Sequence, residues 1–297
     1  MKAILVSIVL VSAPAGADVV APPPPVSLAW ALRPVAPANA VRADTAIGLF
    51  EDGGASGNTV ASVFAVSYKV TPTLSPLVRF AVVRNDPAAG GTATAASNPL
   101  LGAMWAPPLL APPFKLAGFA ALALPLGSGG GNDANPTMTS TVRSAIAARS
   151  GMDNALFAVN DLTPIVGVDA AFVANGLTVQ VEATVFELFR VRGDQVQPDA
   201  YKTNFTSGVQ AGYFVLPVVS ASAELRYQRW LSTPKAVAMD PTGASRDTLS
   251  AALGVRGHIA LGEGRWLRPG VSYARGLDDP LTGRNYQIVQ IDVPFTF

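Results

Sequence analysis

The chain of 297 residues is poor in charge: 14% of its residues are charged and 49% are hydrophobic, whereas a soluble globular chain has about 25% charged residues. Its formal net charge is +1, without the basic excess typical of nucleic-acid-binding proteins. The absence of cysteine and the single histidine exclude disulfides, thiolate metal sites and most histidine-based metal sites. We therefore expect no metal, no cofactor and no nucleic-acid partner.

The first 42 residues divide into two segments that precede the folded part. Met1 and Lys2 are followed by an apolar run and by small residues at 15–17, which is the pattern of a secretory signal peptide over 1–17, cleaved near Ala17. The alternative is a buried N-terminal strand or helix. Six prolines follow between 22 and 37, and they predict an extended, Pro-rich periplasmic linker over 18–42.

The most apolar region, 100–127, has a single charge at Lys115. Its five prolines, at 107, 108, 112, 113 and 125, interrupt any helix because each removes a backbone donor and clashes with the preceding turn. We therefore predict two apolar strands, 99–106 and 114–124, joined by a proline-rich turn.

The C-terminal segment alternates between an apolar and a polar face. One face carries Gln287, Val289, Ile291, Val293, Phe295 and Phe297, and the other carries Tyr286, Ile288, Gln290 and Asp292. Similar alternation occurs over 177–192, 219–231 and 249–259. A period of two with one apolar face predicts half-exposed strands.

Twelve candidate strands of this kind follow one another along the chain. They begin near Asp44, Asn58, Pro76, Pro99, Phe114, Thr163, Leu177, Asn204, Val219, Asp247, Arg265 and Arg284. Most are about 9–13 residues long, which suits tilted strands that cross a bilayer. Short links (71–75, 174–176, 217–218, 261–264) alternate with long ones (85–98, 127–162, 193–203, 232–246, 276–283). The pattern predicts an all-β fold, an antiparallel up-and-down transmembrane β-barrel over 43–297.

The last strand resembles the assembly signal of Gram-negative outer-membrane β-barrels, a terminal Phe preceded by hydrophobic residues at every second position. The matching residues are Val289, Ile291, Val293, Phe295 and Phe297. This resemblance implies an outer-membrane location, contact with outer-membrane lipid and a barrel-assembly machinery as partner. The even strand count predicts that Phe297 lies on the periplasmic side.

A second resemblance is to transporter-like barrels of the phenol-degradation meta-pathway type. Those barrels carry a Pro-Thr-Gly element at the end of a mid-chain strand, before a long loop. Here Leu124-Pro125-Leu126-Gly127 stands at that place, with Leu126 instead of Thr, and Asn98-Pro99-Leu100-Leu101-Gly102 upstream is also similar.

The polar faces supply the candidate lumen residues: Asp169, Glu182, Glu224, Arg226, Arg256, His258, Arg268 and Asp292. The hairpin registers place His258 across from Arg268, and Arg268 across from Asp292. We expect an Arg268–Asp292 ion pair that either lines the lumen or only braces the wall, with Arg226 and Arg256 as a mildly basic patch.

Ser220, His258 and Asp292 also suggest a catalytic triad. In the predicted arrangement Arg268 stands between the acid and the histidine and would pair with the acid first. We therefore favour a lumenal polar network and expect that the protein is not an enzyme.

The longest loop, 127–162, is expected to be functional or disordered. Residues 139–157 could hold one or two helical turns with Val142, Ile146 and Phe157 as apolar anchors. The loop is either a gate over the pore or a surface loop that packs on its neighbours.

The predicted function is a porin-like outer-membrane channel for passive uptake of small solutes through the lumen. A structural or adhesive barrel with a filled lumen is the first alternative, a lipid-modifying barrel enzyme the second, and a soluble secreted β-sandwich the third. The pattern leaves open the identity of the solute and whether the lumen is open or plugged.

Overall fold

The computed structural model describes residues 26–262 and 264–297. The predicted signal peptide at 1–17 and the first part of the predicted linker lie outside these residues. Within the described residues three helices occur: α1 (Pro136–Ala148), α2 (Asn154–Phe157) and α3 (Lys235–Ala238). None of them is long and apolar enough to span a bilayer.

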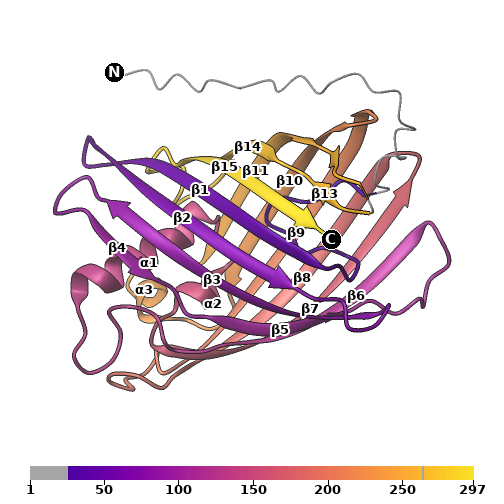
Figure 1. Ribbon diagram of the computed structural model, residues 1–297. Helices are drawn as coiled ribbons and strands as arrows, with labels where there is room; N and C mark the ends of the chain where they lie inside the picture. The colour runs from indigo at the N-terminus through magenta and orange to yellow at the C-terminus, as the bar shows by residue number, and fades with distance from the viewer. Residues whose placement is uncertain (1–25, 263) are drawn as a thin grey trace.

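The strands form one closed antiparallel barrel of twelve strands (Figure 1). In barrel order they are β1 (Ala40–Asp52), β2 (Ala55–Ser67), β3 (Leu74–Asp86), β5 (Leu100–Trp105), β6 (Phe114–Ala123), β7 (Asp161–Ala174), β8 (Leu177–Arg190), β9 (Tyr201–Leu216), β10 (Val219–Trp230), β11 (Asp247–Gly257), β14 (Gly270–Gly276) and β15 (Gln287–Thr296). Pairing of β1 with β15 closes the ring. The short strands β4 (Ala93–Ala96), β12 (Ile259–Ala260) and β13 (Trp266–Leu267) extend it at its ends.

The prediction of an antiparallel β-barrel with twelve strands is therefore confirmed. Four of the twelve strands begin at the predicted residue and the others within five residues of it. The first residue of each strand can be predicted this closely because period-two alternation and turn residues are local signals, which do not depend on the partner strand.

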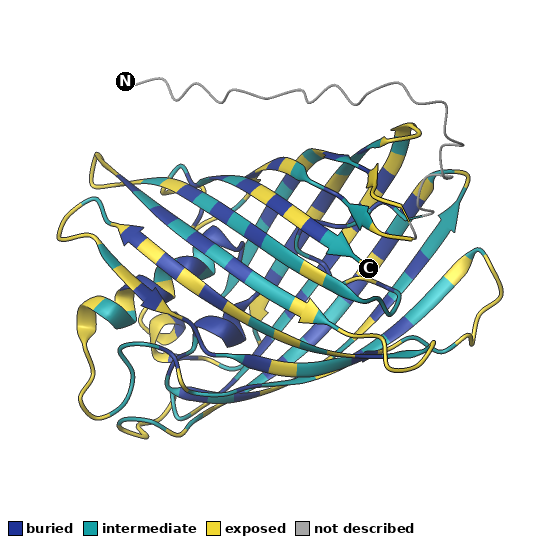
Figure 2. Ribbon diagram, viewed as in Figure 1, coloured by how far each residue is buried: buried dark blue, intermediate teal, exposed yellow. Residues whose placement is uncertain are grey.

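Residues along the strands alternate between buried and more exposed positions (Figure 2). Many of the buried ones are polar and many of the exposed ones are large and apolar, the reverse of a soluble protein. In β15, for example, Gln290 and Asp292 are buried, whereas Ile291 is 46% exposed. The outward face carries large apolar residues on every side of the ring, such as Val66, Phe80, Leu101, Val168, Val181, Val209, Leu225, Val255, Tyr273 and Ile291. An apolar belt around a polar interior is the pattern of a barrel that stands in lipid.

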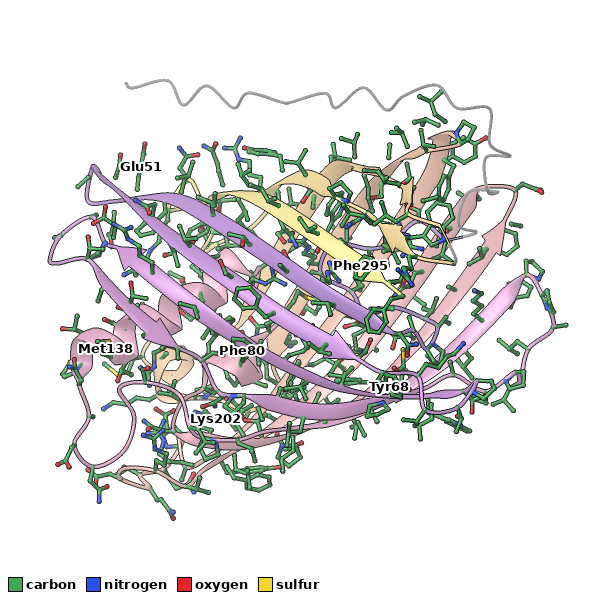
Figure 3. The ribbon with its side chains drawn as sticks, viewed as in Figure 1. Glu51, Tyr68, Phe80, Met138, Lys202 and Phe295 are labelled. Carbon is green, nitrogen blue, oxygen red and sulfur yellow. The ribbon has the colours of Figure 1, made fainter. Side chains whose placement is uncertain are left out.

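The two ends of the barrel differ in their connections. At the end that holds the C-terminus most links are short, as at Asn175-Gly176, where both residues have positive φ and form the two-residue turn that a hairpin favours. The link 258–269 at this end is longer and contains β12 and β13. At the opposite end lie the long loops, 124–160, 191–200, 231–246 and 277–286. Figure 3 places Glu51 and Met138 at this loop end and Tyr68 at the other. The first connection is an exception, because the two residues Gly53 and Gly54 alone join β1 to β2 at the loop end.

Exposed aromatic side chains lie near both ends of the outer wall. Tyr68, Trp105, Phe114 and Tyr213 are at the short-turn end, and Phe189 and Tyr201, whose ring centroids are 5.1 Å apart, are at the loop end. Such belts are characteristic of the two interfaces of a membrane.

The exposed apolar belt leads to a prediction about gel migration. Because this surface needs detergent or lipid to cover it, the folded barrel should persist in SDS until it is boiled. We expect unboiled and boiled samples to migrate at different positions on an SDS gel. Identical migration, together with monomeric behaviour in buffer without detergent, would contradict the barrel.

Candidate functional site: a lumen closed by two plugs

The long loop between β6 and β7 folds into the barrel as a helical plug, which we define as residues 136–157. Its first helix, α1, starts after Asn135, whose side chain accepts a hydrogen bond from the Met138 N–H (3.2 Å), with Pro136 at the first helical position. This is the usual N-terminal cap. Figure 1 shows α1 and α2 within the ring of strands, toward the loop end.

Apolar side chains of the helical plug pack on the inner wall. Val142 and Phe157, two of the predicted anchors, are completely buried, and the third, Ile146, packs at the margin of the same cluster. The wall contributes small and branched side chains from β2 and β3, among them Ala61, Val63, Ala81 and Val83. The predicted helical turns are therefore present, and they lie inside the lumen rather than on the surface.

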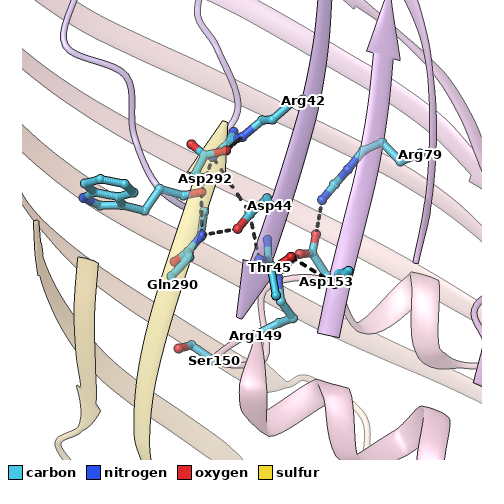
Figure 4. A network of polar contacts seen from close by, with 12 residues as sticks. Arg42, Asp44, Thr45, Arg79, Arg149, Ser150, Asp153, Gln290 and Asp292 are labelled. Atoms are coloured by element: carbon cyan, nitrogen blue, oxygen red, sulfur yellow. Dashed lines mark hydrogen bonds and ion pairs between the residues drawn. The ribbon is translucent and has the colours of Figure 1, made fainter. Parts of the chain in front are cut away.

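Four charged residues fasten the end of α1 to the wall, and we call them the latch: Asp44, Arg79, Arg149 and Asp153 (Figure 4). Arg149 lies 2.8 Å from Asp44 on β1 and 2.9 Å from Asp153. Arg79 on β3 reaches the other oxygen of Asp153 at 2.7 Å. The latch thus joins the helical plug to two neighbouring strands.

The charges of the latch support one another. Burial would raise the pKa of Asp153, but the guanidinium groups of Arg79 and Arg149 outweigh it and lower that pKa to about 2. Burial would likewise lower the pKa of Arg149, but the carboxylates of Asp44 and Asp153 outweigh it and raise that pKa. Arg149 and Asp153 are therefore both charged at neutral pH.

The lowered pKa of Asp153 predicts how acid affects the helical plug. A carboxylate whose pKa is lower in the folded than in the unfolded protein stabilises the fold above its unfolded pKa, near 3.9, and this stabilisation is lost as the pH falls toward 2. Hydrogen exchange of the α1 amides, corrected for its intrinsic pH dependence, should therefore stay slow down to about pH 4 and accelerate below it. The Asp153→Asn variant should exchange fast already at pH 7. Unchanged protection of the wild-type α1 between pH 5 and pH 2 would contradict the role of the latch.

The second plug is the described part of the N-terminal segment, residues 26–39, which we call the N-terminal plug. Trp30 and Leu32 are almost completely buried, at 0% and 1% exposure. The backbone of the plug is held by wall carboxylates. The Trp30 N–H donates to Glu224 Oε2 (2.7 Å) and the Arg33 N–H to Glu182 Oε2 (2.7 Å).

Side chains strengthen this attachment. The Arg33 guanidinium lies 3.3 Å from Asp169 and 3.1 Å from Glu182. On the other side, Arg42 of β1 donates hydrogen bonds to the carbonyls of Ala29 and Trp30. The N-terminal plug is thus tied to opposite sides of the barrel by polar contacts.

The N-terminal plug corrects the prediction of a periplasmic linker over 18–42. Residues 26–39 lie inside the barrel, and from Ala40 the chain is already part of β1. Residues 26–39 form no helix, as their prolines predict, but several of their backbone donors are bonded to carboxylates of the wall. These carboxylates are more than a hundred residues away in the sequence.

The two plugs meet in the middle of the lumen. Met152 of the helical plug packs against Ala29 and Leu32 of the N-terminal plug. Beside this contact, the buried Arg226 donates to Glu224 Oε1 (2.7 Å), to Gln290 Oε1 (3.1 Å) and to Ser150 Oγ (3.4 Å). Arg226 and Glu224 therefore connect both plugs to the wall.

The eight predicted lumen residues all lie on the inner face. Their exposed fractions range from 0% for Asp292 to 8% for Arg268. Asp169, Glu182 and Glu224 hold the N-terminal plug, as described above. Arg226 and Arg256 do not form the predicted basic patch, since Arg226 is paired with Glu224 and Arg256 with Asp292.

The predicted Arg268–Asp292 ion pair is wrong. Asp292 is opposite Gly270 and pairs with Arg42 (2.7 Å) and Arg256, whereas Arg268 donates to Thr296 Oγ1 (3.0 Å). The predicted register is two residues off in this hairpin. A slip of two residues keeps every side chain on its face, so alternation alone cannot detect it.

His258 is hydrogen-bonded through Nε2 to Ser220 Oγ at 2.9 Å. Its Nδ1 has no hydrogen-bond partner among the described residues, whereas a catalytic triad needs an acid at that nitrogen. The geometry fits the lumenal polar network. In residues 26–262 and 264–297 no three His, Cys, Asp or Glu side chains are grouped as ligands of a metal ion would be.

Sequence reasoning missed several residues of the site: Arg33, Arg42, Asp44, Arg79, Arg149 and Asp153. Two signals were available. Arg42 and Asp44 stand two apart on what becomes the inner face of β1, and Arg149 precedes Asp153 by four, a spacing at which helical side chains meet. Neither signal identifies the partner strand.

Comparisons with known proteins support the fold. No protein-family model and no curated protein matches the chain. Among solved structures, an outer membrane channel from Pseudomonas putida F1 matches with a TM-score of 0.53 and 11% identity, covering 90% of this chain and 98% of the other. The NanC porin matches with a TM-score of 0.50 and 8% identity over 86% and 98% of the two chains. At these identities the likeness concerns the barrel fold alone.

Proposed function

We propose that the protein is a gated channel of the Gram-negative outer membrane, through which small solutes pass by passive uptake. The observation that carries the proposal is how the lumen is closed. Side chains alone can fill the interior of a barrel of about eight strands, and wider barrels enclose a cavity or channel. In this barrel of twelve strands, two chain segments occupy the interior.

The contacts of the plugs fit a reversible closure. The N-terminal plug is held by hydrogen bonds and ion pairs to wall carboxylates, and the helical plug by the latch and by packing of Val142 and Phe157. Behind the plugs the inner wall is lined by polar side chains such as Thr178, Gln180, Thr206, Gln210 and Ser250. Such a wall would be wetted when the plugs leave.

The location and partners are part of the same proposal. The apolar outer belt and its aromatic ends suit contact with outer-membrane lipid. Phe297 is exposed at the short-turn end and stacks on Phe295, with ring centroids 5.8 Å apart. In this proposal Phe297 is the residue that contacts the barrel-assembly machinery. The proposed role is transport without catalysis, cofactor or nucleic acid.

One observation favours the alternative, a structural or adhesive barrel with a filled lumen: the two plugs touch at Met152 and Leu32. Current recordings across a planar lipid bilayer distinguish the two functions. A gated channel should show discrete openings of the full chain. A structural barrel should show none, and none after its plugs are shortened.

A further inference from the structure

A cavity of about 620 Å³ lies beside the N-terminal plug. It extends from Arg79 and Arg149 of the latch to Trp266 and Thr296 near the short-turn end. This volume falls within the range of about 300–1,000 Å³ that small-molecule sites have. The helical plug closes the cavity toward the loop end.

The walls of the cavity are mainly apolar. The N-terminal plug contributes Leu28 and Val35, and the strands contribute Val63, Leu77, Met104 and Phe119. Such an apolar chamber would favour a solute with an apolar body, because burial of apolar surface is favourable by about 25 cal/mol per Å².

The charges around this chamber are strongly biased toward one sign. Among the described residues, the cations that line it are Arg33, Arg42, Arg79, Lys115, Arg149 and Arg268, and the one lining acid is Asp44. The carboxylates that pair with Arg33, Arg42 and Arg79 (Asp169, Asp292 and Asp153) do not line the cavity. The cavity therefore presents a cationic surface.

Two of these cations have no carboxylate partner in the part of the chain that the structure describes. The ammonium group of Lys115, half-buried on β6, has no hydrogen bond or ion pair with any described residue. Arg268 is 8% exposed, donates one hydrogen bond to Thr296, and its Nε has no partner. A cation beside apolar walls gains from an anion that shares its chamber.

We infer that this cavity binds a small amphipathic carboxylate, with its apolar body against Phe119 and Met104 and its carboxylate on Lys115. The inference rests on the proposed function and deepens it, since it names the class of solute. Lys115 selects solutes that carry a negative charge, and the apolar walls select solutes that carry an apolar body.

The test uses the full chain in lipid nanodiscs and the fluorescence of Trp266, which lines the cavity. The probe is 4-bromobenzoate, whose bromine quenches tryptophan. We compare it with its neutral analogue, 4-bromobenzamide, and with bromide, which lacks the apolar body. Saturable quenching is expected for 4-bromobenzoate alone and should disappear in the Trp266→Phe variant, which separates the site from probe dissolved in the lipid.

Substitutions at one lysine then test the contact. Lys115→Met should raise the half-saturation concentration of 4-bromobenzoate about tenfold, as loss of one charge-assisted contact does, and Lys115→Arg should restore it. Lys69→Met, in an exposed turn at the same end, should leave it unchanged. Heat-modified migration checks that each variant is folded.

The outcomes separate the two proposals. Equal quenching by the carboxylate and the amide, or an unchanged half-saturation in Lys115→Met, would overturn the site while leaving the channel in place if currents are seen. Saturable, Lys115-dependent binding in a barrel that never conducts would overturn the channel and keep the site.

Discussion

Removal of both plugs is expected to convert the barrel into a persistently open pore. The variant would lack residues 26–37 and would replace 136–157 by a short Gly/Ser linker, so that neither segment described above remains in the lumen. Because the polar inner wall is then in contact with water, currents across a planar bilayer should be open for most of the recording, whereas the full chain should be closed for most of it.

The two single deletions serve as internal controls, since the plugs lie one behind the other along the barrel axis. Removing only the N-terminal plug should leave the pore closed by α1 and α2 at the loop end, and removing only the helical plug should give a partial, narrower opening. Shortening the loop between β10 and β11, at the same end but outside both plugs, should not change the current. A double deletion that folds, as shown by its heat-modified migration, and carries no current would support the filled structural barrel.

Glu224→Ala is expected to be among the most destabilising single substitutions in the lumen. The Glu224 carboxylate accepts hydrogen bonds from the N–H groups of Trp30 and Ala31 and pairs with Arg226, and both charged side chains are at most 2% exposed. Removing one partner of a buried pair leaves an uncompensated charge, at a cost of about 3–5 kcal/mol. Unfolding in guanidinium chloride with the protein in lipid vesicles should show this loss.

A second substitution, at Arg226, tests whether the loss of stability comes from its unpaired guanidinium. The double variant Glu224→Ala with Arg226→Met should recover much of the lost stability, because the unpaired guanidinium is gone. Glu187→Ala, which removes a partly buried carboxylate bonded to Thr203, should cost much less than Glu224→Ala. If Glu224→Ala and Glu187→Ala lower the free energy of unfolding by the same amount, the buried Glu224–Arg226 pair contributes no more to stability than a partly buried carboxylate does.

The barrel could be predicted from the sequence because its signals are local. Alternation in β8, β10 and β15 and the turn at Asn175-Gly176 each depend on a few neighbouring residues. The register of β14 and β15 could not be predicted in the same way, since the slip of Arg268 relative to Asp292 by two residues preserves the alternation.

The content of the lumen was only partly predictable. Val142, Ile146 and Phe157 stand at spacings that suggest helical anchors, and the structure confirms the helices. The N-terminal plug has no such signal, since its prolines favour an extended chain with or without a partner. What holds it inside is the position of Glu182 and Glu224 on strands far along the chain, and these are placed only when the barrel closes.

The central claim is that the N-terminal segment lies inside the barrel, and the absence of cysteine in this chain allows a direct measurement by disulfide trapping. The Ser27 N–H donates to Thr178 Oγ1 at 3.0 Å, across 151 residues of sequence. In the double variant Ser27→Cys, Thr178→Cys, mild oxidation of the folded protein should form an internal disulfide. Its large loop should speed migration on a boiled, non-reducing gel, and reductant should reverse the shift. The pair Ser27→Cys, Thr59→Cys, with Thr59 near the β1–β2 turn at the opposite end, should not cross-link. Failure of the 27–178 pair to cross-link in a heat-modifiable barrel, or equal cross-linking of both pairs, would contradict the plug.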